Sequence, residues 1–153
     1  MGCLRRRFDP CDDGPYRGRV DNAPPRGRIL LVDDDKSAMA GLEALLGDDF
    51  EIVTADGIAD AHARLAERSY DVIVCGYQLP GGTGLDVLRH ASERDPRVIG
   101  IVWTGRADLV TARAEAESFR VIPKTDVPDL ILQVVRQSMA LARLRASMRD
   151  LRQ

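Results

Sequence analysis

The sequence lacks the long apolar segments of a membrane protein and the paired cysteines of a disulfide-stabilised one. None of its apolar runs approaches the roughly 20 residues that span a bilayer, and none follows a basic start as in a signal peptide. Its three cysteines are an odd number, at spacings that fit neither a disulfide framework nor a metal site. These absences exclude a membrane-spanning protein and predict a cytoplasmic one.

The net charge is also small, but the charges are unevenly distributed. The chain has 153 residues, the size of one ordinary domain, and a net charge of −2. Residues 1–26 hold six arginines and four aspartates, and residues 136–153 hold five arginines and one aspartate, so the segment between them is acidic. Basic ends can attract nucleic acid. Because these arginines are scattered, and because basic residues late in a helix complement its dipole, no nucleic-acid partner is expected.

Residues 1–27 are rich in glycine, proline, aspartate and arginine without an apolar period, which predicts a flexible tail. From Arg28 onward, strand and helix signals alternate, which indicates βαβ units around a parallel sheet. The expected strands cover residues 29–32, 50–54, 72–75, 98–103 and 121–122.

Helices are expected between and after these strands. Their markers are Met39, Leu42, Leu45 and Leu46 with Gly47 as a stop; Asp56 as a cap with Ile58, Ala61 and Leu65 inward; Leu85 and Leu88; and the alanine-rich segment 107–118. That fourth helix carries few large apolar residues, so it should be short and loosely held.

The last helix should start with Asp126 as its cap and Pro128 in its first turn. Its apolar residues then form two sets. Leu130, Ile131, Val134 and Val135 would pack on the sheet, and Leu141, Leu144, Met148 and Leu151 follow at alternating spacings of three and four, as in a coiled-coil seam. The second set predicts a homodimer or a partner helix. The alternative is a frayed amphipathic tail.

Groups suited to a phosphoryl site follow the strands. The first strand ends in Asp33, Asp34 and Asp35, the fourth in Thr104 and the fifth in Lys124, whereas the third ends in Gly76. In an open parallel sheet, ligands bind at the carboxyl ends of the strands. The aspartates, the hydroxyl, the ammonium and a position without a side chain should therefore converge on one crevice.

This set of residues resembles the receiver domain of two-component response regulators, from about Arg28 to about Ser138. The loop after the third strand also matches, through Gln78, Leu79, Pro80 and the run Gly81, Gly82, Thr83 and Gly84. The resemblance implies a flavodoxin-like, doubly wound (β/α)5 fold whose five-stranded parallel sheet has the order 2-1-3-4-5. We expect an N-terminal tail at 1–27, a receiver-like domain at 28–138, and an extension of the last helix at 139–153.

In that family the acidic pair binds magnesium, and an aspartate ending the third strand accepts phosphate from a histidine kinase. The hydroxyl and the lysine contact the phosphoryl oxygens. Asp33 and Asp34 match the acidic pair, Thr104 the hydroxyl and Lys124 the lysine, but Gly76 stands at the acceptor position. Thr125 replaces the usual proline after the lysine, and Val121 replaces the usual aromatic residue.

These departures predict a non-enzymatic pseudo-receiver, in which Asp33, Asp34 and Lys124 form a fixed electrostatic cluster and the output is a protein-binding surface. No cofactor is expected, since Asp33 and Asp34 would hold magnesium weakly or not at all. The alternative is a working phospho-receiver that uses Mg²⁺ and another acceptor such as Asp35.

Other polar residues give weaker signals. His62 and His90 lie on separate predicted helices, with no second ligand expected near either. Tyr77 should point away from the side that Gly76 faces. Cys75 should be a small buried residue of the third strand, and Asp71 should lie at the opposite edge of the sheet.

Overall fold

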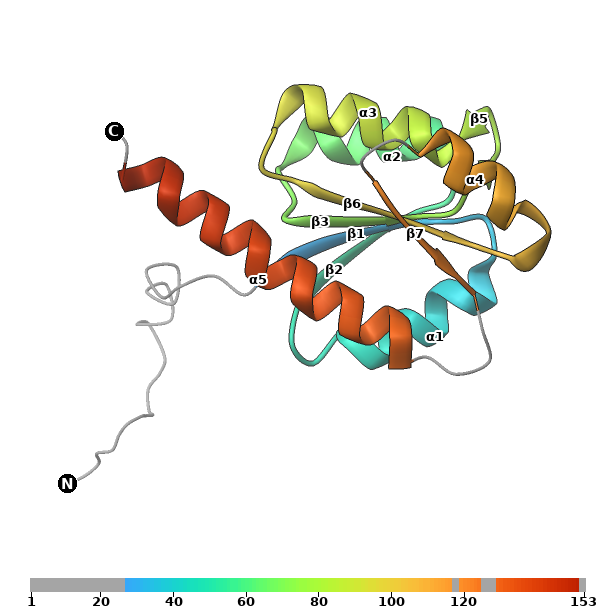
Figure 1. Ribbon diagram of the computed structural model, residues 1–153, viewed down its shortest axis with the longest axis horizontal. Helices are drawn as coiled ribbons and strands as arrows, with labels where there is room; N and C mark the ends of the chain where they lie inside the picture. The colour runs from blue at the N-terminus through green and yellow to red at the C-terminus, as the bar shows by residue number, and fades with distance from the viewer. Residues whose placement is uncertain (1–26, 117–118, 125–128, 152–153) are drawn as a thin grey trace.

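The computed structural model describes residues 27–116, 119–124 and 129–151. A five-stranded parallel sheet forms its centre, with the strand order β2-β1-β3-β6-β7 (Figure 1). Its strands are β1 (Arg28–Val32), β2 (Glu51–Ala55), β3 (Val72–Cys75), β6 (Ile99–Thr104) and β7 (Arg120–Pro123). The expected order 2-1-3-4-5 is confirmed, since β6 and β7 are the fourth and fifth strands of this sheet.

Helices cover both faces of the sheet, as a doubly wound fold requires (Figure 1). One face carries α1 (Lys36–Leu46) and α5 (Asp129–Leu151); the other carries α2 (Ile58–Glu67), α3 (Gly84–Arg94) and α4 (Leu109–Glu115). No helix of the described segments is long and apolar enough to cross a membrane.

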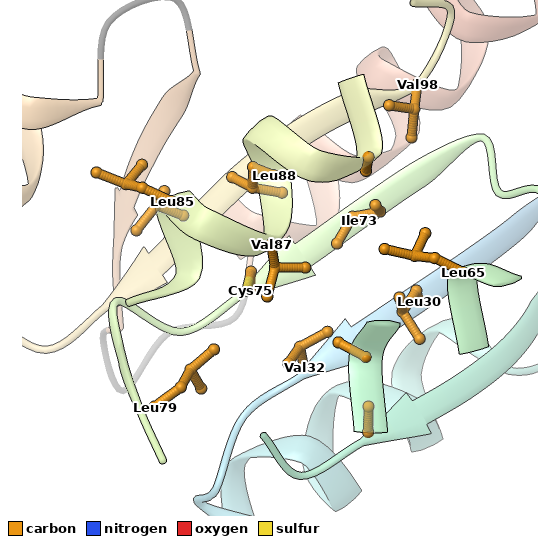
Figure 2. Close-up of a cluster of buried hydrophobic side chains, with 14 of the residues drawn as sticks. Leu30, Val32, Leu65, Ile73, Cys75, Leu79, Leu85, Val87, Leu88 and Val98 are labelled. Atoms are coloured by element: carbon orange, nitrogen blue, oxygen red, sulfur yellow. The ribbon is translucent and has the colours of Figure 1, made fainter. Parts of the chain in front are cut away.

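The apolar strands divide their side chains between two cores. In β1, Ile29 and Leu31 pack with α1 and α5, whereas Leu30 and Val32 pack with α2 and α3 (Figure 2). Successive side chains of a strand point to opposite faces, so a strand that is covered on both faces is apolar throughout. The continuous apolar run at 29–32 has this cause.

The helix starts differ in part from those expected. Asp35 caps α1, since its carboxylate accepts a hydrogen bond from the Ala38 amide at 3.1 Å. Asp56 does not cap α2, so that prediction is wrong. The chain stays extended through Gly57, which takes the cap position, and the Asp56 amide donates to the Asp60 carboxylate at 3.3 Å.

Two features of α1 also differ from expectation. Leu45 is 43% exposed, so it is not part of the buried face formed by Met39, Leu42 and Leu46. Gly47 follows the helix with a φ of −64°, a right-handed conformation open to any residue. The helix therefore ends where glycine predicted it, but without the left-handed turn that favours glycine.

The connection between β3 and α3 contains a small hairpin that the sequence did not predict. Its strands β4 (Gln78–Leu79) and β5 (Gly82–Thr83) pair antiparallel, and Gly81 and Gly82 have positive φ values of 98° and 156°. Glycine adopts such backbone conformations without steric cost, which explains the two glycines of this turn.

The fourth helix is short, as predicted. A 3₁₀ turn, η2 (Arg106–Asp108), leads into the seven residues of α4, whose one buried residue is Ala112. In α5, Ile131, Val134 and Val135 are buried against the sheet, but Leu130 is 43% exposed and does not join them. The helix continues unbroken through 23 residues, which confirms the extended C-terminal helix. The predicted cap Asp126 and Pro128 lie outside the described residues.

Candidate functional site

The carboxyl ends of four strands bring the predicted site residues to one edge of the sheet. Val32 pairs with Cys75, and Thr104 pairs with Pro123, so the residues that follow these strands lie side by side. The Gly76 amide donates to the Val32 carbonyl at 2.8 Å, and the Lys124 amide donates to the Thr104 carbonyl at 2.7 Å. These backbone bonds hold Asp33 beside Gly76, and Lys124 beside Thr104.

Asp33 and Lys124 form the main charged contact of this edge. The Asp33 side chain is 5% exposed, and its Oδ2 lies 2.6 Å from Nζ of Lys124, whose side chain is 24% exposed. This contact is an ion pair without hydrogen-bond angles, because Oδ2 has no hydrogen-bond partner among the described residues. The other oxygen, Oδ1, accepts from the Asp35 amide at 3.0 Å. Both oxygens of Asp33 are therefore engaged.

The second acid beside Lys124 is Asp35, whereas the predicted cluster contained Asp34 at this place. Nζ of Lys124 lies 4.0 Å from Oδ2 of Asp35 and 5.1 Å from the ring centroid of Trp103. Asp34 is exposed and makes no ion pair with a described residue. Asp35 can serve both contacts because one of its oxygens caps α1 while the other faces the ammonium.

Gly76 is buried directly against the Asp33 carboxylate. A Cβ atom at position 76 would stand 3.0 Å from Oδ2 and 3.1 Å from Cγ of Asp33, closer than ordinary van der Waals contact. Asp33 would have to shift by a few tenths of an ångström to admit any side chain there. The Asp33 carboxylate thus crowds the position that follows β3.

Thr104, the hydroxyl residue of the predicted site, is 3% exposed at the end of β6. Within the described part of the chain, no group of three histidine, cysteine, aspartate or glutamate side chains is arranged to hold a metal ion. The edge therefore combines one tight ion pair, two exposed carboxylates, Asp34 and Asp35, and a buried hydroxyl.

Tyr77 points away from this edge, as predicted. It is buried in the core formed with α2, α3 and α4, and its hydroxyl donates a hydrogen bond to the Glu115 carboxylate of α4. That hydrogen bond, together with burial, raises the pKa of the Tyr77 hydroxyl. Glu115 was not predicted, since nothing in its surroundings in the chain marks it as a partner of Tyr77.

Cys75, the last residue of β3, is fully buried, which agrees with its predicted role as a small core residue. Burial raises the pKa of its thiol, and the negative charge of Asp33 adds to the shift. The start of α3 is equally close-packed: a Cβ atom at Gly84 would stand 2.0 Å from the Gly76 carbonyl oxygen. Only glycine fits at this contact between the two segments.

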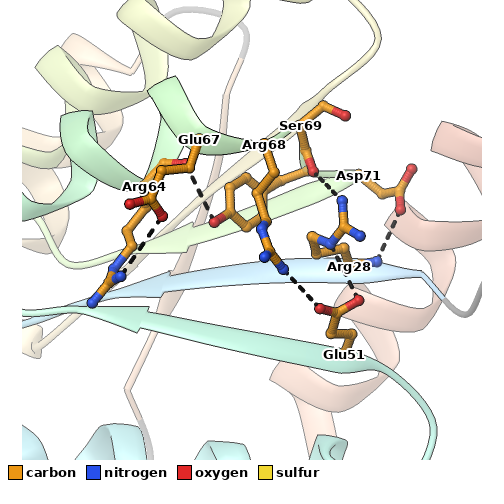
Figure 3. Close-up of polar contacts among 8 residues, drawn as sticks. Arg28, Glu51, Arg64, Glu67, Arg68, Ser69 and Asp71 are labelled. Carbon is orange, nitrogen blue, oxygen red and sulfur yellow. Dashed lines mark hydrogen bonds and ion pairs between the residues drawn. The ribbon is translucent and has the colours of Figure 1, made fainter.

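Asp71 lies at the opposite edge of the sheet, where the strands begin (Figure 3). Its carboxylate accepts a hydrogen bond from the Arg28 amide at 2.9 Å, and the Arg28 guanidinium reaches Glu51 at 3.2 Å and the Ser69 carbonyl at 3.0 Å. This network closes the start of the sheet. Asp71 thus stabilises the start of the sheet and does not contact Asp33 or Lys124.

The structure corrects the prediction for the two histidines. His62 of α2 and His90 of α3 lie together, with ring centroids 4.3 Å apart and ring planes inclined by 35°. Nε2 of His62 is buried without a hydrogen-bond partner among the described residues. Burial, and then the proximity of His90, lower the pKa of His62, while Asp86 acts in the opposite direction. The packing of α2 on α3 creates this pair.

The predicted interaction residues of α5 lie on the surface. Leu141, Leu144 and Met148 are 42%, 57% and 48% exposed. Leu151 is the last residue of the helix, and its side chain lies outside the described part.

Comparisons with known proteins match this architecture. The family model of the response regulator receiver domain matches residues 29–136. The hydrogenase transcriptional regulatory protein HoxA of Cupriavidus necator is 31% identical over 126 residues, which are 80% of this chain and 26% of HoxA. The DNA-binding transcriptional regulator NtrC of Escherichia coli is 31% identical over 115 residues, 72% of this chain and 24% of NtrC.

A solved structure described as adenylate cyclase from Rhodopirellula baltica has a TM-score of 0.73 and 30% identity, and the match covers 82% of this chain and 96% of that one. The chain spans about a quarter of the length of the two regulators above. Together with the family model, these matches cover most of the chain. The chain therefore belongs to the response regulator receiver domain family of two-component signalling.

Proposed function

We propose that this receiver domain is a pseudo-receiver, a non-enzymatic module that acts by binding a protein partner independently of phosphorylation. Gly76 carries the proposal, because glycine offers no side-chain oxygen to accept a phosphoryl group. Oδ2 of Asp33 would also stand 3.0 Å from the Cβ atom of any acceptor side chain at position 76. The domain would act in the cytoplasm, and its surface would be its output.

The ion pair between Asp33 and Lys124 supports a single fixed state of the carboxyl edge. In a working receiver the lysine contacts the phosphoryl group, so its ammonium must be free to meet a new charge. Here Nζ of Lys124 lies 2.6 Å from Asp33, in a largely buried contact. Removing an ammonium from a buried carboxylate is costly, because it leaves the carboxylate uncompensated.

The donor set also argues against a resident magnesium ion. Mg²⁺ requires near-octahedral oxygen ligation and is usually held by one or two carboxylates together with phosphate oxygens. Both oxygens of Asp33 are engaged by Lys124 and by the Asp35 amide, which leaves Asp34 as the one unengaged carboxylate of the expected acidic pair. We therefore propose that magnesium binding is weak or lost.

A small-molecule phosphodonor with magnesium tests the proposal. We expect no acid-labile phosphate on the intact chain by mass spectrometry, and no change in Trp103 fluorescence on adding beryllofluoride. Trp103 is a suitable reporter because its ring lies 5.1 Å from Nζ of Lys124. A mass adduct of one phosphoryl group at a carboxylate would contradict the pseudo-receiver.

Asp35 as an alternative phosphoacceptor is favoured by one observation, since its side chain is 51% exposed and lies 4.0 Å from Nζ of Lys124. Its other carboxylate oxygen caps α1 by accepting from the Ala38 amide. A phosphoryl adduct that disappears in Asp35→Asn, but persists in Asp34→Asn, would establish this alternative.

A further inference from the structure

A groove of about 440 Å³ lies where α5 passes the starts of β6 and β7. Its walls are partly apolar, formed by Val98, Ile99, Phe119 and Leu141. Arg120 and Arg145 stand at its rim, and no carboxylate belongs to the described residues that line it. The groove thus combines partly apolar walls with positive charge.

The exposed stripe of α5 continues this groove. Leu141 lines the groove and also begins the stripe with Leu144 and Met148. At 3.6 residues per turn, these three residues share one side of the helix, and Arg145 lies next to Leu141 on the groove side. The end of α5 extends beyond the sheet, so this surface projects from the body of the domain (Figure 1).

The two arginines of the groove have no ion-pair partner among the described residues. Arg120 and Arg145 are exposed, and neither makes an ion pair with another described residue. Arg136, one of the other arginines of α5, instead pairs with Asp49 at 3.3 Å. Exposed apolar side chains beside these two cations favour an occupant that is apolar on one side and acidic at its flanks.

We propose that the groove and the α5 stripe bind an acidic amphipathic helix of a partner protein. This inference deepens the proposed function, since it names the chemistry of the partner. Apolar side chains of the partner would cover Leu141, Leu144 and Met148, and its carboxylates would meet Arg120 and Arg145. Helix-in-groove docking of this kind presents anchors at spacings of three and four, which match the spacing along α5.

A second copy of the chain fits this surface less well. With Leu141 and Met148 at heptad positions a, and Leu144 at d, Arg145 is at e, and the g positions hold Ala140 and Ser147. In a parallel pair, residues at e and g of the two helices meet, so Arg145 would find no carboxylate. Nucleic acid is also disfavoured, because two arginines beside an apolar wall are not a track of phosphate contacts.

Two synthetic helical peptides with the same leucine seam test the proposal, one with glutamate and one with lysine at the flanking positions. We measure their binding to the full-length chain by fluorescence anisotropy. The glutamate peptide should bind about tenfold more tightly than the lysine peptide, and salt should weaken it. Arg145→Glu should abolish this preference, and Leu144→Glu should remove binding of both peptides.

Arg143→Glu is the matched control, since Arg143 lies on the other side of α5 from the stripe. Circular dichroism should show that all three variants fold, because Leu144 and Arg145 are exposed. Equal affinity for both peptides, or a preference that survives Arg145→Glu, would overturn the proposal. So would a homodimer in light scattering that excludes the peptide, or a DNA duplex that displaces it from wild type but not from Arg145→Glu.

These measurements contain no phosphodonor, so they are independent of the test of the pseudo-receiver. A chain that accepts phosphate but still selects the glutamate peptide would refute the proposed function and leave the docking site intact. A chain that takes no phosphate and shows no selectivity would refute the docking site alone.

Discussion

Lys124 and Asp33 lie 2.6 Å apart with the carboxylate almost fully buried. Stability should therefore suffer more from the loss of the Lys124 ammonium than from the loss of the Asp33 charge. Lys124→Ala leaves an uncompensated carboxylate and should destabilise the fold by about 2–3 kcal/mol in urea unfolding. Asp33→Asn in the Lys124→Ala background should recover part of that loss. Lys36→Ala, an exposed lysine, is the control and should change stability little. Strict additivity of the Lys124 and Asp33 changes would show that the two groups do not interact.

Position 76 allows a converse test of the proposed pseudo-receiver. Gly76→Asp places a second carboxylate against Asp33, and like charges at this distance oppose ionisation. We expect a lower melting temperature than in the wild type and a partial recovery on adding magnesium, which the wild type should not show. Gly76→Asn adds a similar volume without charge and should be insensitive to magnesium. If magnesium also leaves the melting temperature of Gly76→Asp unchanged, the remainder of the site is not intact.

The histidine pair predicts a pH dependence of stability. Burial and the neighbouring His90 lower the pKa of His62 below its ordinary value of 6.5, so the unfolded chain binds the proton more readily. The contribution of His62 is therefore complete above about pH 6.5 and is lost as the pH falls from there through the lower pKa of the folded state. In urea unfolding between pH 7.5 and about pH 5, His62→Gln should lose less stability than the wild type.

His90→Gln is the matched variant for this prediction. It removes the neighbouring charge but leaves the burial of His62, which is the larger cause of the lowered pKa. The pH dependence should thus fall between that of the wild type and that of His62→Gln. If the free energy of unfolding of His62→Gln falls with pH as steeply as that of the wild type, the acid sensitivity comes from other groups.

At the scale of the element, α5 has two halves with different roles. Ile131 is 3% exposed in the first half, and Leu144 is 57% exposed in the second. Ile131→Ala should lower the free energy of unfolding by about 2–4 kcal/mol because it leaves a cavity against the sheet. Leu144→Glu should change it by less than about 0.5 kcal/mol. Similar losses of unfolding free energy in the two variants would mean that the second half of α5 packs against the rest of the protein without a partner.

The strands and helices also show which features of the fold can be predicted from sequence patterns. The five strands of the parallel sheet are found within a residue or two, because buried parallel strands are apolar throughout and are followed by turn residues. The cap of α2 was predicted wrongly at Asp56, since an aspartate before a helix does not reveal where the chain leaves its extended conformation. Leu130 was placed with the buried stripe by spacing alone, although the first turn of α5 leaves it exposed.

At the scale of the whole molecule, the proposal divides the protein into a receiver body and a projecting helix. Whatever acidic partner co-purifies with the intact chain should be lost when the chain is cut after Ala140, because the cut removes Leu141, Leu144 and Arg145. The single variant Arg145→Glu should lower its recovery in the same pull-down, whereas Lys124→Ala should not. Equal recovery of the partner by the intact and shortened chains would place the interaction on another surface.

The sequence by itself determined the order of strands and helices, the convergence of Asp33, Thr104 and Lys124 on one edge, and the glycine, Gly76, that follows the third strand there. These follow from local periodicity and from the rule that parallel strands end together. Only the tertiary structure decided that Lys124 meets Asp33 and Asp35 rather than Asp34, and that His62 meets His90. Such contacts depend on side-chain directions and on the packing of helices distant in sequence, which no local pattern encodes.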